Sequence, residues 1–263
     1  FPIFESAAKT MEIFLETALQ AARAADQTTM AYYRGDFDVE IKEDQTPVTV
    51  ADKGAEEVIR GILLDAFPDH GFFGEESGKR QADAEYLWLV DPIDGTKSFV
   101  GGYGMWSTQI ALMHRGELVL GVSSAPAMGE TAWAAAGQGA RLDSRPIRVS
   151  ETTSLDNAAV STGNLGTMAR SARWQVLGDV MARVNRTCGY GDYYHYHRLA
   201  AGQIDAVIES DVNILDIAAL TVIVREAGGV FTDLEGRPPG LETTSVLAAT
   251  PALHAHLLDM FNP

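Results

Sequence analysis

The order of predicted secondary structure constrains the fold of this chain more than any other feature of its sequence. Apolar residues recur at three- and four-residue steps over residues 6–33 and 51–67, which predicts two amphipathic helices. Strands are predicted at 72–74, 86–90, 106–113, 118–123 and 131–136, and hairpin-type turns join the last three. The first half is therefore expected to form two helices and a largely antiparallel sheet.

After Pro146 the pattern changes to an alternation of strands and helices. Strands are predicted at 158–161, 186–188, 206–209, 230–232 and 246–249, and helices at 172–184, 192–201, 214–226 and 251–260. Such alternation with short connections is typical of an α/β unit. We divide the chain into residues 1–143 and 144–263. Because no repeat or low-complexity linker separates the halves, we expect them to share a broad interface as one compact unit.

The acidic balance of the chain excludes several classes of partner. Its 263 residues carry 20 Lys and Arg against 36 Asp and Glu, a formal net charge of −16, whereas sequence-independent nucleic-acid binding needs a basic surface. No apolar run approaches the roughly 18–20 residues of a membrane-spanning helix. The one cysteine, Cys188, forms no internal disulfide, and the first residues lack the basic and apolar segments of a secretory signal peptide. We therefore expect a cytoplasmic protein without a nucleic-acid or membrane partner.

Acidic residues cluster where predicted strands end. Glu75 follows the strand at 72–74, Asp91 and Asp94 follow the next strand within the run Asp-Pro-Ile-Asp-Gly-Thr, and Asp216 lies at the start of a long apolar helix. A single aspartate after a strand usually caps a turn or a helix. In this run, however, a proline and a glycine force a tight turn, so Asp91 and Asp94 are expected to project close together with the Ile93 carbonyl between them.

Like charges held this close need compensation, because they cannot all stay ionised otherwise. Lys97 is the one cation adjacent to them in sequence, and all-oxygen ligand sets suit Mg²⁺ or Mn²⁺. Gly95 and Thr96 offer backbone N–H groups and a hydroxyl beside that site, where an anionic oxygen can bind. Carboxylates, metal and N–H donors together favour metal-assisted phosphoryl transfer to water, and bound metal would let so acidic a chain accept a phosphate ester.

Three segments of the chain resemble the signatures of the inositol monophosphatase family. These are Gly74-Glu75-Glu76-Ser77, Asp91-Pro92-Ile93-Asp94-Gly95-Thr96 and Leu215-Asp216-Ile217-Ala218-Ala219, in the expected order and spacing. Similar features run from the first helix to the last strand, so the resemblance covers nearly the whole chain. It implies an αβαβα sandwich, Mg²⁺-dependent phosphomonoester hydrolysis, a homodimer and inhibition by lithium.

The resemblance also assigns roles to individual residues. It implies a first metal bound by Glu75, Asp91 and the Ile93 carbonyl, and a second, weaker one bound by Asp91, Asp94 and Asp216. A third, looser magnesium would lie near Glu75. Glu75 and Thr96 would position and deprotonate the attacking water with Asp52 as a supporting acid, and Gly95 and Thr96 would hold the phosphate through their backbone. Glu76 is expected either to support the metal ligands without binding metal itself or to cap the backbone. Lys97 is expected to be solvated or to lie at a helix N-terminus.

The substrate is expected to depend on the segment between Gly191 and the last signature. Asp192 followed by Tyr193-Tyr194 resembles the histidinol-phosphate phosphatase branch of the family, as does the run 95–102 with Trp106-Ser107-Thr108 after it. Glu209 lies seven residues before Asp216, the spacing at which the family places a substrate-binding acid. Histidinol phosphate carries an ammonium and an imidazole, so carboxylates would accept its N–H donors, whereas an inositol ring has only neutral hydroxyls. Asp192 can instead cap the following helix, and Glu209 can be a solvated strand end. For His195 and His197 we favour surface positions over the pocket.

Two departures from the family pattern and two other functions stay open. Leu215 replaces an aromatic residue, which bears on pocket shape, and residues 210–214 (Ser-Asp-Val-Asn-Ile) replace the usual residues of the family. Within that segment, Asp211 adds an acid that either favours a cation or caps the next helix. Among enzymes, the alternatives are inositol-1-phosphate or broad sugar-phosphate hydrolysis. A non-catalytic metal- or phosphate-binding protein is the alternative from another class, and the presence of every metal ligand and of Thr96 argues against it.

Overall fold

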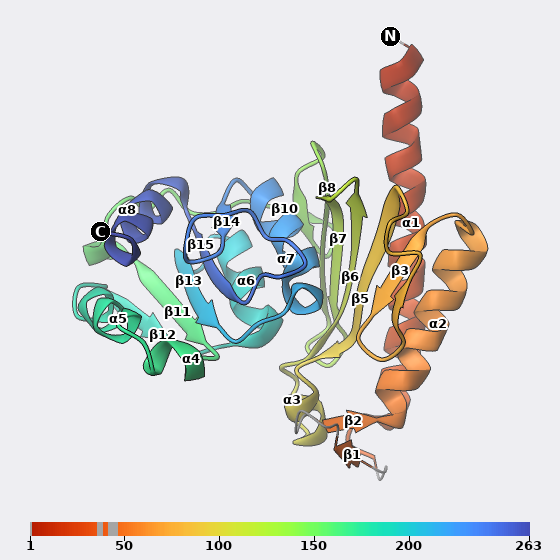
Figure 1. The fold of residues 1–263 in the computed structure, drawn as a ribbon, viewed down its shortest axis with the longest axis horizontal. Coiled ribbons are helices and arrows are strands. Elements are labelled where there is room, and N and C mark those ends of the chain that lie inside the picture. Colours follow the sequence, from red (N-terminus) through yellow and green to blue (C-terminus); the bar gives the residue numbers. More distant parts are fainter. Residues whose placement is uncertain (1, 36–38, 42–46) are drawn as a thin grey trace.

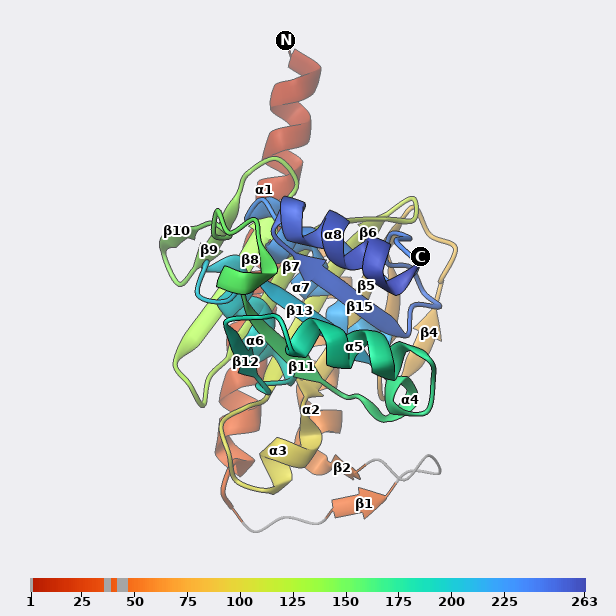
Figure 2. The ribbon, with the colours of Figure 1, turned by 90° about the vertical axis from the view of Figure 1, so that its left-hand side faces the viewer.

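The computed structural model describes residues 2–35, 39–41 and 47–263, and it arranges them in five layers (Figures 1 and 2). Two long helices, α1 (Pro2–Tyr32) and α2 (Val50–Ala66), cover the outer face of an eight-stranded sheet. Helices α6 (Asp192–Ala200) and α7 (Ile214–Glu226) lie between that sheet and a five-stranded one. Helices α4 (Gly166–Ala169), α5 (Arg173–Met181) and α8 (Pro251–Phe261) cover the far face. The expected αβαβα sandwich is therefore confirmed.

The eight-stranded sheet is antiparallel except for one pair of strands. Its order is β10-β9-β8-β7-β6-β5-β3-β4, with β3 parallel to β5. The strands are β3 (Gly71–Gly74), β4 (Gly78–Arg80), β5 (Tyr86–Asp94), β6 (Ser107–His114), β7 (Glu117–Ala125), β8 (Glu130–Ala135), β9 (Ala140–Leu142) and β10 (Arg145–Ile147). A separate pair, β1 (Val39–Ile41) and β2 (Pro47–Thr49), precedes α2. The central strand β5 runs directly into the acidic turn.

The five-stranded sheet is mixed and has the order β12-β11-β13-β15-β14. Strand β11 (Ala159–Gly163) is parallel to β12 (Arg186–Cys188) and to β13 (Ala206–Ser210). Strand β15 (Ser245–Ala249) is antiparallel to β13 and to β14 (Val230–Thr232). Helix α6 enters the middle layer just before β13, and α7 follows β13, so both helices begin near the acidic turn of the other half.

Apolar side chains fill the spaces between the layers. One core lies between α1, α2 and the first sheet, a second surrounds α6 and α7 between the two sheets, and a third lies under α5 and α8. Helix α7 is apolar nearly all round because both sheets bury it. Contacts of α7 with β7, β6 and β8 join the two halves, so Asp216 in its first turn is fixed relative to β5.

The predicted long helices and strands are confirmed to within a few residues at their ends. The sequence did not predict the short elements α3 (Thr96–Val100), α4, β4, β9, β10 and a 3₁₀ turn at Leu155–Asn157. Strand β10 extends the first sheet to Ile147, four residues beyond the boundary drawn at 143. Phe1 lies outside the described residues. None of the helices described here is both long and apolar enough to cross a membrane.

Candidate active site

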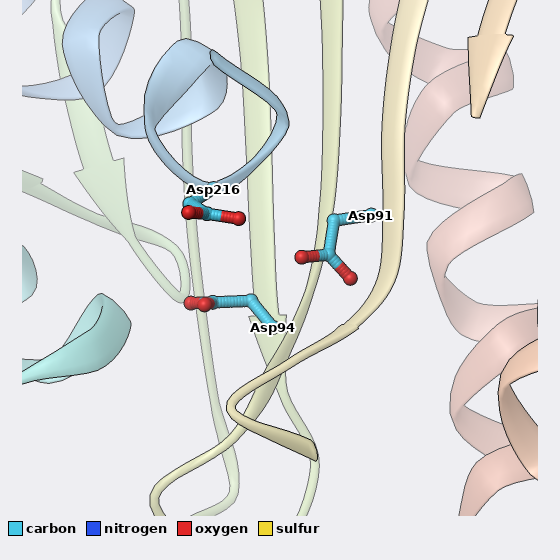
Figure 3. A group of neighbouring side chains, drawn as sticks. All are labelled: Asp91, Asp94 and Asp216. Atoms are coloured by element: carbon cyan, nitrogen blue, oxygen red, sulfur yellow. The ribbon is translucent and has the colours of Figure 1, made fainter. Parts of the chain in front are cut away.

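The two aspartates of the acidic turn lie at the end of β5, near the middle of the eight-stranded sheet. Strand β5 pairs with β6 as far as Asp91 opposite Gln109, and the register then shifts before Asp94 pairs with Ser107. Residues three apart in a regular strand point to opposite faces, but this bulge turns both carboxylates to the same side (Figure 3). Asp91 is 3% exposed and Asp94 9%, so both are acidic groups in the interior.

Asp216 reaches the same point from the other half of the chain. It is the third residue of α7, and its carboxylate accepts the backbone N–H of Asn213 at 2.9 Å and the side-chain amide of Asn213 at 2.7 Å. This reciprocal cap fixes the helix start. Asp91, Asp94 and Asp216 point toward one another (Figure 3), with one oxygen of each within 4.8 Å of the others. The structure thus brings together the three aspartates that the sequence analysis grouped.

Crowding and burial make the ionised forms of these acids costly. Burial raises the pKa of Asp91 well above its usual value, and the charges of Glu75, Asp94 and Asp216 add to the rise. Burial also raises the pKa of Asp94, which Asp192 and Asp216 raise further. Burial brings the pKa of Asp216 to about 7, although the hydrogen bonds from Asn213 oppose it. A cation among these oxygens would restore the ionised forms.

The glycine and threonine of the turn begin the short helix α3. Gly95 has a φ of 86°, and a Cβ there would lie 2.8 Å from the Met105 carbonyl oxygen, so both conformation and space require glycine. The Thr96 hydroxyl donates a hydrogen bond to the Ile93 carbonyl at 3.0 Å. Because that bond uses the only hydroxyl proton, the lone pairs of Thr96 Oγ1 are oriented away from Ile93.

Glu75 and Asp52 add two further acids to the cluster. The backbone N–H of Glu75 donates to the Val90 carbonyl at 3.1 Å, which ties the loop after β3 to β5. Asp52 is the third residue of α2, where its carboxylate accepts the backbone N–H of Thr49 at 2.7 Å. Burial raises the pKa of Asp52, and the Glu75 charge adds to the rise. Asp52 Oδ1 is buried without a hydrogen-bond partner among the described residues, as expected for an oxygen that serves a bound group.

A small cavity next to the aspartates holds the two predicted substrate-binding acids. It is lined by Asp94, Asn164, Asp192, Tyr196, Glu209, Val212, Asp216, Ile217 and Leu220. Glu209 is 2% exposed, and it accepts the Tyr196 hydroxyl at 2.7 Å, while His195 Nε2 lies 3.2 Å from the same oxygen. Burial and the charge of Glu209 together raise the pKa of Asp192 to about 6, although His195 and Lys97 oppose the rise. The solvated position considered for Glu209 is therefore wrong.

Three other expectations about this region need correction. Asp192 does not cap α6, because Gly191 occupies the cap position, no side chain caps the helix there, and Asp192 is its first residue with a φ of 47°. His195 and His197 are fully buried, not on the surface. His197 Nδ1 lies 2.8 Å from Glu130 and its Nε2 2.8 Å from the Ser123 hydroxyl.

The two departures from the family pattern lie at the edge of the cavity, which Val212 lines but Asp211 and Leu215 do not. Asp211 does not cap α7, which Asn213 caps; its carboxylate accepts the Thr167 backbone N–H at 2.8 Å and so holds the start of α4. Leu215 is buried in the middle core. Tyr196 and Asn164 also line the cavity, and neither was predicted from the sequence. Tyr196 lies four residues after Asp192 on the predicted helix, and that helical spacing was the available signal.

The donors gathered here fit a hard divalent cation. Carboxylate oxygens from strand β5 and helix α7 converge, and neighbouring carboxylates raise the pKa of both Asp91 and Asp94. A larger hollow of about 470 Å³ between residues 148–153 and the start of α8 contains none of these acids. The acidic cavity is therefore the candidate active site.

Comparison with known proteins agrees with this geometry. The model of the inositol monophosphatase family matches residues 10–262. The histidinol-phosphatases of Streptomyces coelicolor and Mycobacterium tuberculosis are 39% and 38% identical, each over 94% of this chain and 96% and 97% of the relative. A fructose-1,6-bisphosphatase/inositol-1-monophosphatase of Aquifex aeolicus is 31% identical, over 96% of both chains.

Solved structures show the same fold. The extragenic suppressor protein suhB of Bartonella henselae superposes with a TM-score of 0.88 at 30% identity, over 95% of this chain and 98% of that one. The IMPase of Thermotoga maritima gives a TM-score of 0.84 at 31% identity, over 94% and 96%. The chain therefore belongs to the inositol monophosphatase family, and it is a phosphoric monoester hydrolase.

Proposed function

We propose that this phosphatase is Mg²⁺-dependent and that its substrate is histidinol phosphate. Glu75, Asp91 and the Ile93 carbonyl would hold one Mg²⁺, and Asp91, Asp94 and Asp216 a second. Converging carboxylate oxygens support this assignment, since Mg²⁺ takes oxygen ligands and Mn²⁺ suits the same donors. Bound metal would supply Lewis-acid stabilisation of the phosphoryl oxygens and a more acidic water.

The residues of this chain would orient the water and take its proton. The Thr96 hydroxyl donates to the Ile93 carbonyl, so its lone pairs are available to accept a hydrogen bond from a water. The Glu75 carboxylate is the proposed proton acceptor, and Asp52, on the first turn of α2, supports it. The backbone N–H groups of Gly95 and Thr96 would hold phosphate oxygens. The water oxygen bonds to phosphorus as the phosphorus–oxygen bond to the leaving group breaks, and the leaving oxygen takes a proton from solvent water to become the alcohol.

The pairing of Asp192 and Glu209 in one cavity is the observation that carries the substrate assignment. Burial raises the pKa of Asp192 to about 6, and the Glu209 charge contributes to that rise. Two carboxylates desolvated together bind a cation favourably, and the ammonium and imidazole of histidinol provide cationic and N–H groups. The two relatives named histidinol-phosphatase support the same substrate.

Inositol-1-phosphate is the second candidate, and one observation favours it. The neutral amide of Asn164 lines the cavity, and Glu209, which accepts the Tyr196 hydroxyl, is a hydrogen-bond acceptor there. The neutral hydroxyls of an inositol ring would therefore also find hydrogen-bond partners. The homodimer and lithium inhibition expected from the resemblance, and the cytoplasmic location expected from the composition, stay predictions.

A phosphate-release panel tests the proposal. The purified protein is assayed with histidinol phosphate, inositol-1-phosphate and a nucleotide, each with Mg²⁺ and after chelation with EDTA. We expect kcat/KM for histidinol phosphate to exceed the other two at least tenfold and all activity to vanish with EDTA. A preference for inositol-1-phosphate would establish the alternative, and full activity in EDTA would refute the metal assignment.

A further inference from the structure

A buried glutamate on α2 lies next to the acidic loop, although neither the motifs nor the cavity include it. Glu56 follows Asp52 by one helical turn, and it is 3% exposed. It occupies the inward face of α2 beside the apolar residues Ala55 and Ile59. A carboxylate in such surroundings needs hydrogen-bond partners, because burying an unpaired charge is costly.

The partners of Glu56 are backbone groups of the loop that carries Glu75. Glu56 Oε2 accepts the N–H of Glu76 at 2.7 Å, and Oε1 accepts the N–H of Ser77 at 2.8 Å. A Cβ at Gly74 would lie 2.5 Å from the carboxyl group of Glu56, so this side chain packs directly against the loop backbone. Glu56 therefore contacts the backbone immediately before and immediately after Glu75.

The loop is held from its other side by β5. The N–H of Glu75 donates to the Val90 carbonyl at 3.1 Å, one residue before Asp91. With β5 on one side and the Glu56 carboxylate on the other, the backbone of Glu75 has little freedom. The charge of Glu75 raises the pKa of both Asp52 on α2 and Asp91 on β5, so its carboxylate lies near both of these acids.

We propose that Glu56 is a positioning residue that holds Glu75 toward Asp91 by accepting two backbone N–H groups of the loop. The inference rests on the proposed function, in which Glu75 binds metal and takes the proton of water. Both carboxylate oxygens of Glu56 accept N–H groups of the loop. Its contribution is orientation, and groups that orient metal ligands typically change metal affinity or activity about 10- to 100-fold when replaced.

The substitution Glu56→Gln tests the inference. An amide has one acceptor oxygen, so it can accept only one of the two N–H groups, and its own NH₂ would face the other. Glu57→Gln is the matched control, since Glu57 is the exposed neighbour on the same helix. Glu56→Asp keeps the charge on a shorter side chain and is expected to fall between wild type and Glu56→Gln. Circular dichroism shows which variants are folded.

Mn²⁺ binding measured by electron paramagnetic resonance supplies a readout that does not depend on turnover. We expect Glu56→Gln to weaken Mn²⁺ binding at least tenfold and to lower kcat at least tenfold, with KM within about threefold. Glu57→Gln should match wild type. If Glu56→Gln lowers the melting temperature but leaves Mn²⁺ affinity and kcat unchanged, Glu56 contributes only to stability and the inference is overturned. If Glu56→Gln does not fold, the same result for Glu56→Asp overturns it. Wild-type protein that binds no Mn²⁺ would overturn the proposed metal site and this inference with it.

Discussion

Replacing Asp192 by asparagine separates recognition of the substrate from hydrolysis. Asp192 is the first residue of α6, lines the cavity beside Glu209 and has a φ of 47°. Asparagine has nearly the same shape and tolerates the left-handed region as well as aspartate does. Because no side chain caps α6 at this point, the substitution removes no cap. We therefore expect Asp192→Asn to fold normally.

The expected loss follows from the charge of Asp192. Its pKa of about 6 leaves the carboxyl ionised at pH 7.5 and half protonated near pH 6. A hydrogen bond to a charged group contributes about 1.5–3 kcal/mol, which corresponds to a loss of roughly 10- to 100-fold in kcat/KM for histidinol phosphate. Since kcat/KM reports the free enzyme, the advantage of wild type over the variant should shrink as the pH falls through 6.

Phosphate release measured from pH 5.5 to 8 provides the assay. Wild type and Asp192→Asn are compared on histidinol phosphate and on a small neutral phosphate ester, with the exposed Asp156→Asn as control. Hydrolysis of the neutral ester should stay within about twofold, because Thr96 and the metal-binding acids are unaltered. Equal losses on both substrates would make Asp192 structural. No loss on either would remove the main support for a cationic substrate.

Three further outcomes can be measured. Asp91→Asn and Asp94→Asn should each abolish nearly all phosphate release. Without metal, each variant should melt at the same temperature as wild type or higher, because one of the crowded charges is removed. Near-normal turnover in saturating Mg²⁺ would contradict the roles of these two residues. Folding raises the pKa of Asp216 to about 7, so the stability supplied by its protonation is complete below the pKa of the unfolded state and is lost as the pH rises through 7. The melting temperature in EDTA should therefore fall between pH 5 and 8 and recover with Mg²⁺. A melting temperature that does not change with pH would contradict the crowding of these acids. Tyr196→Phe removes the hydroxyl that donates to Glu209, so chemical denaturation should show a loss of about 1–3 kcal/mol, and unchanged stability would contradict that contact.

The sequence allowed prediction of the parts of the site that rest on local rules. An apolar strand followed by Asp-Pro-Ile-Asp-Gly-Thr placed Asp91 and Asp94 together, and the apolar run after Asp216 predicted a helix start there. Those features depend on residues adjacent in sequence. The same local information also located the long helices and the inner strands.

The errors concern contacts between distant residues. His195 and His197 were expected on the surface, yet both are buried, and their partners Glu209 and Ser123 lie 14 and 74 residues away in sequence. Glu56 interrupts the apolar face of α2, and the residues next to it in sequence do not indicate that it contacts the loop 20 residues away. Short elements such as β9 and β10 were missed because three residues carry too little periodicity.

The bulge in β5 explains the proline of the acidic motif through hydrogen-bond accounting. Where pairing with β6 is interrupted, side chains form the hydrogen bonds of the β5 backbone. The Asp91 carboxylate accepts the N–H of Ile93 at 2.9 Å, and the Thr108 hydroxyl donates to the Pro92 carbonyl at 2.9 Å. Any other residue at 92 would bring an additional N–H into this buried segment, one step from the acids, where the ladder offers no acceptor. Proline is the residue that adds no donor, so its missing N–H suits this position as much as its rigid ring does.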